Sequence, residues 1–217
     1  MATGTDLFAF WHGVPGEARA HPLDQPVLDR VKHSFNTNCL LGPYMGRLKT
    51  APIVFLFLSA GFSESDPAHG NSEAGRDFYH RQRSGLADLP TLAEHPDAVV
   101  WAQRILKQFQ IDWNEARSKI AFLNISPYKS KTFDDWPMLS ALPSCRAAVG
   151  WAQTVLFEQA AADERLVICL RSAASWGLGR KCSIPGVLVP KFTRNGTILL
   201  AERAEVVDAV QRKLRAS

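Results

Sequence analysis

The sequence lacks the short motifs that identify several large classes of enzyme. It contains no P-loop, no G-x-G-x-x-G and no G-x-S-x-G elbow, which argues against NTPases, dinucleotide-binding enzymes and α/β-hydrolases. Its four cysteines form no C-x-x-C pair, and its six histidines show no metal-ligand spacing. We therefore expect neither a metal site nor a cofactor.

Signals for export and membrane insertion are also missing. The start, MATGTDLFAFWHG, has no basic residues followed by an apolar stretch, and no apolar run reaches membrane-spanning length. Cysteines without a signal peptide are typical of a reducing compartment. The sequence therefore predicts a cytoplasmic protein with no membrane partner.

Length and charge limit the number of domains and the kinds of partner that the chain is expected to have. A chain of 217 residues, 46% of them hydrophobic, suits a single α/β domain, with an N-terminal helical extension over 1–50 and a core over 51–217. The formal charge is +4, from 25 basic and 21 acidic residues. Such a surplus is compatible with an anionic partner such as DNA, and equally with no such partner.

Four short apolar runs predict buried strands. They are IVFLFL at 53–58, KIAFLNI at 119–125, RLVICLR at 165–171 and GVLVP at 186–190. Runs of this kind belong to parallel sheets that are covered by helices on both faces. The predicted fold class is α/β, a three-layer α/β/α arrangement with a short four-stranded, mostly parallel central sheet.

Apolar residues at helical spacing predict the helices of the outer layers. Helices are expected over 24–35, with Asp24 as a possible cap, over 95–109, from Ser144 onward, and over 202–215. Two segments are predicted as loops instead, 36–52 and 59–96. The second is long and polar, so it is either a functional loop or a disordered one.

In a parallel α/β sheet the ligand crevice lies beyond the carboxyl ends of the strands. The first such end, SAGFSESD, contains Gly61, where glycine permits a sharp turn, and then Glu64 and Asp66. These carboxylates are candidates for holding a catalytic water. Ser63 or Asp66 would equally serve only to cap a turn.

The second strand end, LNISPYKS, combines an amide, an aromatic ring and two cations. Asn124 has the donor and acceptor that reading a base edge requires. Tyr128 offers a stacking face, and Lys129 and Lys131 suit phosphates. The alternative is an asparagine that satisfies loop backbone beside two solvated lysines.

Arginines follow the other two strands. Arg171 would bind a phosphate or form an ion pair with Glu64 or Asp66. Arg194 would bind a phosphate or simply be exposed to solvent. If these ends form one site, Glu64, Asn124 and Arg194 should converge on one crevice.

Within the predicted loop 59–96, RDFYHR places Phe78 and Tyr79 where they would stack on a base or anchor the loop. His69 and His80 lie in the same segment, within reach of the first strand end.

This order of elements resembles the uracil-DNA glycosylase superfamily, over roughly residues 50–215. FLSAG at 57–61 is similar to the family's first motif, G-x-x-P-G, with Ala60 in place of the proline. Asn124 in NISP matches the asparagine that reads the uracil edge, and Phe78 or Tyr79 matches the base-stacking aromatic. The resemblance implies base excision from DNA, with a pocket formed by Gly61, Phe62, Phe78, Tyr79 and Asn124.

Two departures affect the chemistry that the resemblance implies. The family's water-positioning residue falls on Leu58, which is apolar, and KFTRN at 191–195 has no histidine to stabilise the departing base. Glu64 or Asp66 would have to orient the water instead, and Arg171 or Arg194 would have to stabilise the departing base.

Three hypotheses therefore stand. In the first, the chain excises a damaged or deaminated base from DNA. In the second, it binds a nucleobase or nucleic acid on the same fold without catalysis. In the third, it is another enzyme, with Glu64 and Asp66 as acid and base and the histidines of 59–96 assisting.

Overall fold

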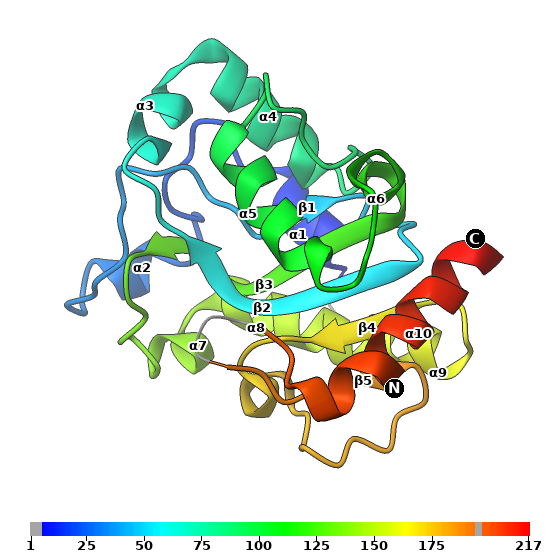
Figure 1. Cartoon of the computed structure of the whole chain (residues 1–217). Helices are drawn as coiled ribbons and strands as arrows, with labels where there is room; N and C mark the ends of the chain where they lie inside the picture. Colours follow the sequence, from blue (N-terminus) through cyan, green and yellow to red (C-terminus); the bar gives the residue numbers. More distant parts are fainter. Residues whose placement is uncertain (1–5, 194–196) are drawn as a thin grey trace.

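The computed structural model describes residues 6–193 and 197–217. Within these residues the centre is one five-stranded sheet of order β1-β3-β2-β4-β5 (Figure 1). The strands are β1 Tyr44–Gly46, β2 Ile53–Gly61, β3 Ile120–Ser130, β4 Leu166–Cys169 and β5 Val187–Leu188. Strands β2 to β5 are parallel, and β1 pairs antiparallel with β3 at one edge. The predicted α/β class is confirmed.

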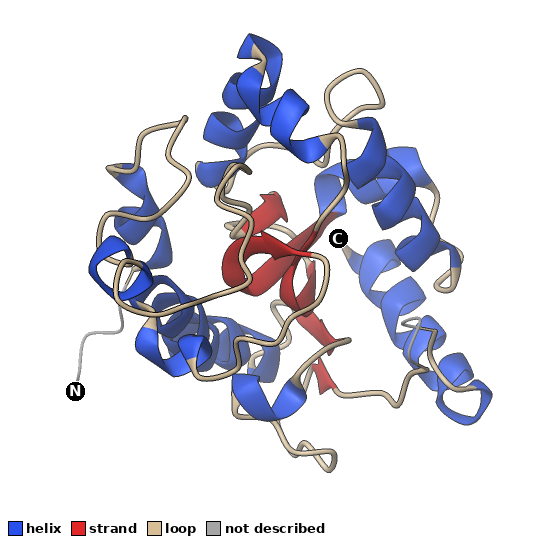
Figure 2. Cartoon of the chain, turned by 90° about the vertical axis from the view of Figure 1, so that its left-hand side faces the viewer, coloured by secondary structure: helices blue, strands red, loops and turns tan. Residues whose placement is uncertain are grey.

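Helices cover both faces of this sheet (Figure 2). One layer holds α1 Leu7–His12, α8 Pro143–Trp151 and α9 Phe157–Ala161, the last two joined by the π-helical turn Ala152–Leu156. The other layer holds α5 Pro96–Lys107, α6 Trp113–Lys119 and α10 Leu200–Ala216. Alternate strand residues enter the two layers: Val54 and Leu56 pack in the first, Phe55 and Phe57 in the second. This alternation explains why β2 is apolar at every position from 53 to 58.

The prediction of 36–52 as loop is wrong in part. Tyr44–Gly46 form the edge strand β1, so the N-terminal extension is not only helical and contributes to the central sheet. Three residues are too few to show the alternation that identifies a strand in a sequence. Gly46 has a φ of +89°, and a Cβ there would lie 2.4 Å from the Ile120 carbonyl oxygen, so glycine is required.

The prediction of 59–96 as a long loop is also wrong. The segment forms α3, Asp66–Asn71, and α4, Glu73–Arg83, with Ser72 capping α4 by accepting the Gly75 N–H. Five residues form the buried face of α4, namely Gly75, Phe78, Tyr79, Gln82 and Arg83. Because three of the five are glycine, glutamine and arginine, the apolar residues of this face are the neighbours Phe78 and Tyr79, which show no helical period in the sequence.

The central strands run further than predicted. β2 continues to Gly61 and β3 to Ser130, with an irregularity in their pairing between Ser59 and Gly61. Ala60, Gly61 and Asn124 therefore lie on strands, and the turn begins only after Phe62. The predicted strand ends are thus displaced, but both remain at one edge of the sheet.

Three of the remaining helices follow the predictions with altered ends, whereas α6 was not predicted. α5, α8 and α10 form where apolar periodicity indicated, whereas the predicted helix 24–35 is reduced to α2, Gln25–Leu28. Asp24 does not cap α2 with its side chain; its carboxylate accepts hydrogen bonds from Tyr128 and Ser144 instead. Two further short segments are α7 Met138–Ala141 and the 3₁₀ turn Ala173–Trp176.

All four cysteines are free thiols. Over the described ranges, none of the helices has the length and apolar character needed to cross a membrane.

Candidate functional site

A cavity of about 190 Å³ lies where the ends of β2 and β3 meet α4 and the start of α5. Six aromatic residues are among those that line it: Tyr44, Phe62, Phe78, Tyr79, Trp101 and Phe122. Trp101 packs against Phe122 with ring centroids 5.1 Å apart. Pockets for drug-sized ligands have volumes of about 300–1,000 Å³, so this cavity suits a smaller molecule.

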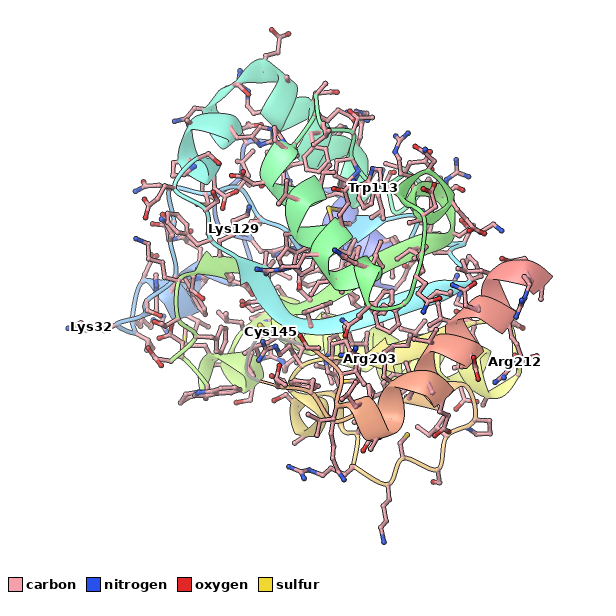
Figure 3. All side chains as sticks on the ribbon, in the orientation of Figure 1. Lys32, Trp113, Lys129, Cys145, Arg203 and Arg212 are labelled. Carbon is pink, nitrogen blue, oxygen red and sulfur yellow. The ribbon has the colours of Figure 1, made fainter. Side chains whose placement is uncertain are left out.

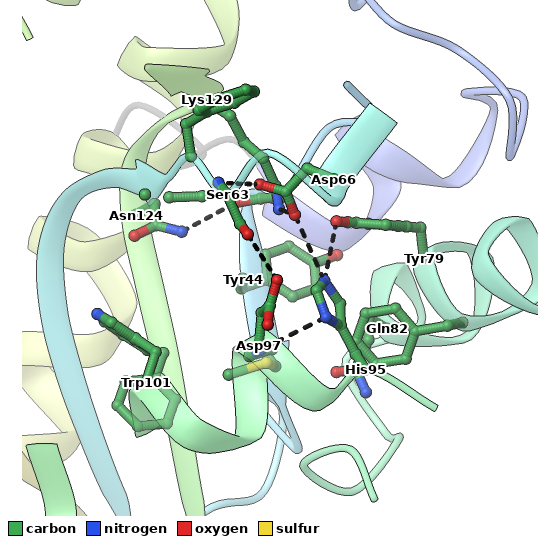
Figure 4. Close-up of a pocket in the computed structure, with 18 residues that line it drawn as sticks. Tyr44, Ser63, Asp66, Tyr79, Gln82, His95, Asp97, Trp101, Asn124 and Lys129 are labelled. Atoms are coloured by element: carbon green, nitrogen blue, oxygen red, sulfur yellow. Dashed lines mark hydrogen bonds and ion pairs between the residues drawn. The ribbon is translucent and has the colours of Figure 1, made fainter. Parts of the chain in front are cut away.

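Most of the predicted site residues line this one cavity (Figure 4). They are Gly61, Phe62, Asp66, Phe78, Tyr79, Asn124 and Lys129. They come from four elements and span 68 positions of the sequence, from 61 to 129.

Other predicted residues lie elsewhere. Glu64 does not line the cavity; it is exposed and pairs with Lys131 in an adjoining groove. The expected convergence of Glu64 with Asn124 is therefore not found. Arg171 pairs with neither Glu64 nor Asp66; its guanidinium lies over the Phe192 ring, 5.3 Å from the centroid. Arg194 falls outside the described residues.

Asp66 is a buried ion-pair partner. Its side chain is 2% exposed, its Oδ1 lies 2.5 Å from Lys129 Nζ, and its Oδ2 accepts the Ser63 N–H at 2.6 Å. Burial alone would lower the pKa of Lys129, but the Tyr79 hydroxyl and the Asp66 carboxylate outweigh it and raise that pKa. Lys129 thus stays charged. Asp66 was predicted to orient a water and Lys129 to bind a phosphate. Because the two pair with each other, neither has its predicted role.

His95, which the sequence did not single out, completes this cluster. As the cap of α5 its Nδ1 accepts the Ala98 N–H at 3.4 Å, so Nε2 carries the proton. Nε2 lies 3.4 Å from Tyr79 Oη and 3.7 Å from Asp66 Oδ1. Burial, with Lys129 nearby, lowers the pKa of His95 to about 4. The imidazole is therefore neutral at pH 7, and it positions Tyr79 and Asp66.

Asp97 is the carboxylate at the cavity that retains access to solvent. It lies in the first turn of α5 and accepts hydrogen bonds from the Ser63 hydroxyl, at 2.5 Å, and from the Ser65 hydroxyl. These two hydroxyls lower the pKa of Asp97, so it stays ionised at neutral pH. The only sequence signal for it was its place in the first turn of a predicted helix, where acidic residues are ordinary.

Asn124 lines the cavity, and one of its two polar side-chain atoms has no partner in the part of the chain that the structure describes. Its Nδ2 donates to the Gly42 carbonyl oxygen at 2.8 Å, and because a carbonyl only accepts, this fixes the side-chain orientation. Among the described residues no donor reaches Asn124 Oδ1. The side chain therefore offers an acceptor for an N–H of a ligand, whereas its donor, which the base-reading hypothesis also needed, is used by Gly42.

Leu58, at the position that the resemblance assigns to water orientation, does not line the cavity. Its side chain packs with the core on the other face of the sheet. Water orientation would therefore have to come from another residue.

The part of the chain that the structure describes contains no group of three or more His, Cys, Asp or Glu residues arranged to hold a metal ion. Comparisons with protein-family models, curated proteins and solved structures find no significant match to this chain.

Proposed function

We propose that this chain binds a flipped-out nucleobase in the cavity and excises it from DNA, as a divergent uracil-DNA-glycosylase-like enzyme. The observation that carries the proposal is the cavity itself, which combines aromatic walls with the free Oδ1 of Asn124. Enzymes that act on a base remove it from the stack and read its polar edge between aromatic side chains. A cytoplasmic setting, consistent with four free thiols, belongs to the same proposal.

Asp97 is the residue that would support the chemistry. Cleavage of the N-glycosidic bond adds a water to C1′ of the sugar while the bonding electron pair leaves with the base, which then takes up a proton. An ionised carboxylate at the mouth of the cavity would orient that water and stabilise positive charge developing on the sugar. It replaces Glu64 and Asp66 in this role.

Lys129 would stabilise the departing base. Its ammonium group lines the cavity and stays protonated, so it offers positive charge where the base acquires negative charge. The Asp66 carboxylate balances part of that charge, which limits the expected effect. Arg171 does not line the cavity, so we assign this role to Lys129 instead.

A polyanionic partner is favoured by the charge of one long segment. From Arg165 to Ala201 the sequence contains no aspartate or glutamate, whereas it contains Arg171, Arg180, Lys181, Lys191 and Arg194. Arg180 and Lys181 are exposed. Such a segment suits the phosphates of a nucleic acid better than a free base, which carries no phosphate.

A second candidate, binding of a nucleobase without excision, is favoured by a separate observation. Leu58 lies away from the cavity, and the buried acid that lines it, Asp66, is neutralised by Lys129. On this view the cavity recognises a base but lacks a sufficient catalyst.

The two candidates are separated by one assay. The purified chain is incubated with single- and double-stranded oligonucleotides that carry uracil, hypoxanthine or a mismatch, and abasic sites are detected by alkaline cleavage. Tryptophan fluorescence follows binding in parallel, since Trp101 lines the cavity. Abasic product supports excision. Salt-sensitive binding without product supports the second candidate, and absence of both refutes the two together.

A further inference from the structure

A polar groove of about 520 Å³ adjoins the cavity, and the two share the Phe62 side chain as a wall. The groove lies between the segment after Ser34 and the end of β3. Asn36, Asn38 and Thr132 are among its polar lining residues. The Asn36 Oδ1 accepts the Asn38 N–H at 2.9 Å, so the amide nitrogen of Asn36 remains available as a donor.

Ser130 indicates that the groove is built to bind a ligand. Its residue is 7% exposed, it lines the groove, and its hydroxyl has no hydrogen-bond partner among the described residues. Buried polar groups are almost always paired, and an unpaired one is costly. The hydroxyl itself is covered, so a ligand oxygen in the groove would satisfy it after a small movement that uncovers it.

Lys131 provides the charge that selects such a ligand. Its ammonium group lies 5.4 Å from the centroid of the Phe62 ring, so it stands at the boundary between the groove and the cavity. Its partner is Glu64, the one carboxylate among the described lining residues. The side chains are 69% and 79% exposed, and such exposed pairs contribute little, so the pair opens readily.

We propose that the groove is a phosphate subsite, in which Lys131 and Ser130 bind the phosphate of the nucleotide whose base occupies the cavity. The inference rests on the proposed function and deepens it, because it makes the ligand a phosphorylated nucleoside rather than a free base. Glu64 acts as a competing anion: it neutralises Lys131 in the unliganded protein and is displaced by the incoming phosphate.

The test compares binding of 2′-deoxyuridine with binding of its 5′- and 3′-monophosphates, and repeats the comparison with the 2′-deoxyinosine series. Affinities are measured by titration calorimetry at low salt. In the unmodified chain at least one monophosphate should bind about tenfold tighter than its nucleoside, which is the size expected of a charge-assisted hydrogen bond. Lys131→Met should reduce this gain to less than about twofold and leave nucleoside affinity unchanged. Glu64→Gln should increase the gain in affinity that the phosphate provides.

Arg212→Gln is the control. It removes the same charge from an exposed position on α10, on the opposite side of the molecule from Lys129 in β3 (Figure 3). The phosphate gain should be unchanged in this variant. Both Lys131 and Glu64 are exposed, so their variants are expected to fold.

The outcomes separate this inference from the proposed function. Equal affinities for nucleoside and both monophosphates overturn the phosphate subsite and leave the base cavity standing. If no nucleoside binds but inorganic phosphate shifts the Lys131 amide resonance in NMR spectra, the base cavity is refuted and the anion site is supported. If neither binds, both are overturned.

Discussion

At the scale of single residues, the environment of each carboxylate decides what it can do. Asp66, Glu64 and Asp97 lie within 34 positions of one another in the sequence, yet the structure gives them different partners: a buried lysine, an exposed lysine and two serine hydroxyls. Only Asp97 is ionised, solvent-accessible and at the cavity. Glu64 and Asp66 were chosen from the sequence because they follow a strand directly, and adjacency along the chain does not show which partner a side chain meets.

Replacement of Asp97 tests its proposed role. Asp97→Asn retains one side-chain oxygen, which can accept from both Ser63 and Ser65 as Asp97 Oδ2 does, so the fold should persist, but it removes the charge that would orient water. We expect excision to fall by about 100-fold or more, whereas affinity for the oligonucleotide stays within about threefold. Initial rates of abasic-site formation and fluorescence titration measure the two effects.

The matched variant is Asp208→Asn on α10, which removes a carboxylate away from the cavity. Its excision rate should equal that of the unmodified chain. An unchanged rate in Asp97→Asn would remove Asp97 from the mechanism.

At the scale of elements, α4 and α5 determine the shape of the cavity. α4 is attached to the edge strand because the Tyr44 hydroxyl donates to the Arg83 carbonyl oxygen at 2.6 Å and Gln82 Oε1 accepts the Gly46 N–H at 2.7 Å. This places Phe78 and Tyr79 against the strand ends. The same two aromatics had been predicted for the site from the sequence, within a segment whose helices were not predicted.

The start of α5 makes the stability of the protein depend on pH. His95 is neutral in the folded state, with a pKa of about 4, against 6.5 for a free histidine. Between pH 6.5 and pH 4, His95 is therefore protonated in the unfolded chain but stays neutral in the folded protein. The free energy of unfolding decreases as pH falls through this range. The largest loss from this residue is about 3 kcal/mol, since each pKa unit corresponds to roughly 1.4 kcal/mol.

His95→Asn checks this expectation, because asparagine also caps a helix and does not titrate. Urea unfolding at pH 7.5 and pH 4.5 should show a smaller loss of stability in His95→Asn than in the unmodified chain. His21, whose burial also lowers its pKa, contributes equally in both. An identical loss in the two proteins would contradict a neutral His95.

At the scale of the whole molecule, the N-terminal segment is integrated with the core by a buried carboxylate. Asp24 is fully buried and accepts hydrogen bonds from Tyr128 Oη at 2.7 Å, from the Ser144 hydroxyl at 2.5 Å and from the Ser144 N–H at 2.9 Å. It thereby links the segment before residue 50 to β3 and to the first turn of α8.

Asp24→Ala would leave these three donors without their acceptor. We expect a loss of about 3 kcal/mol or more in the free energy of unfolding, since each buried unsatisfied group costs roughly 1–3 kcal/mol. Asp29→Ala, at an exposed position of the same segment, should change stability by less than about 0.5 kcal/mol. Chemical denaturation measures both. A loss below 1 kcal/mol in Asp24→Ala would show that the segment is held mainly by other contacts.

The sequence by itself determined the parallel strands, because a strand that is buried on both faces is apolar over most of its length, as IVFLFL shows. It also predicted that residues at and after the strand ends lie together, and Gly61, Asp66 and Asn124 do line one cavity. The short edge strand and α4 were not predicted, because three residues show no period and a buried face that includes Gly75 and Gln82 shows no apolar residue at every turn of the helix.

Only the tertiary structure decided which charges remain available. The pairing of Asp66 with Lys129, of Glu64 with Lys131, and of Asp97 with two serines depends on contacts between segments that lie 32 to 67 positions apart. Electrostatic interactions depend on distance in space and on burial, and neither is encoded in the local pattern of residues.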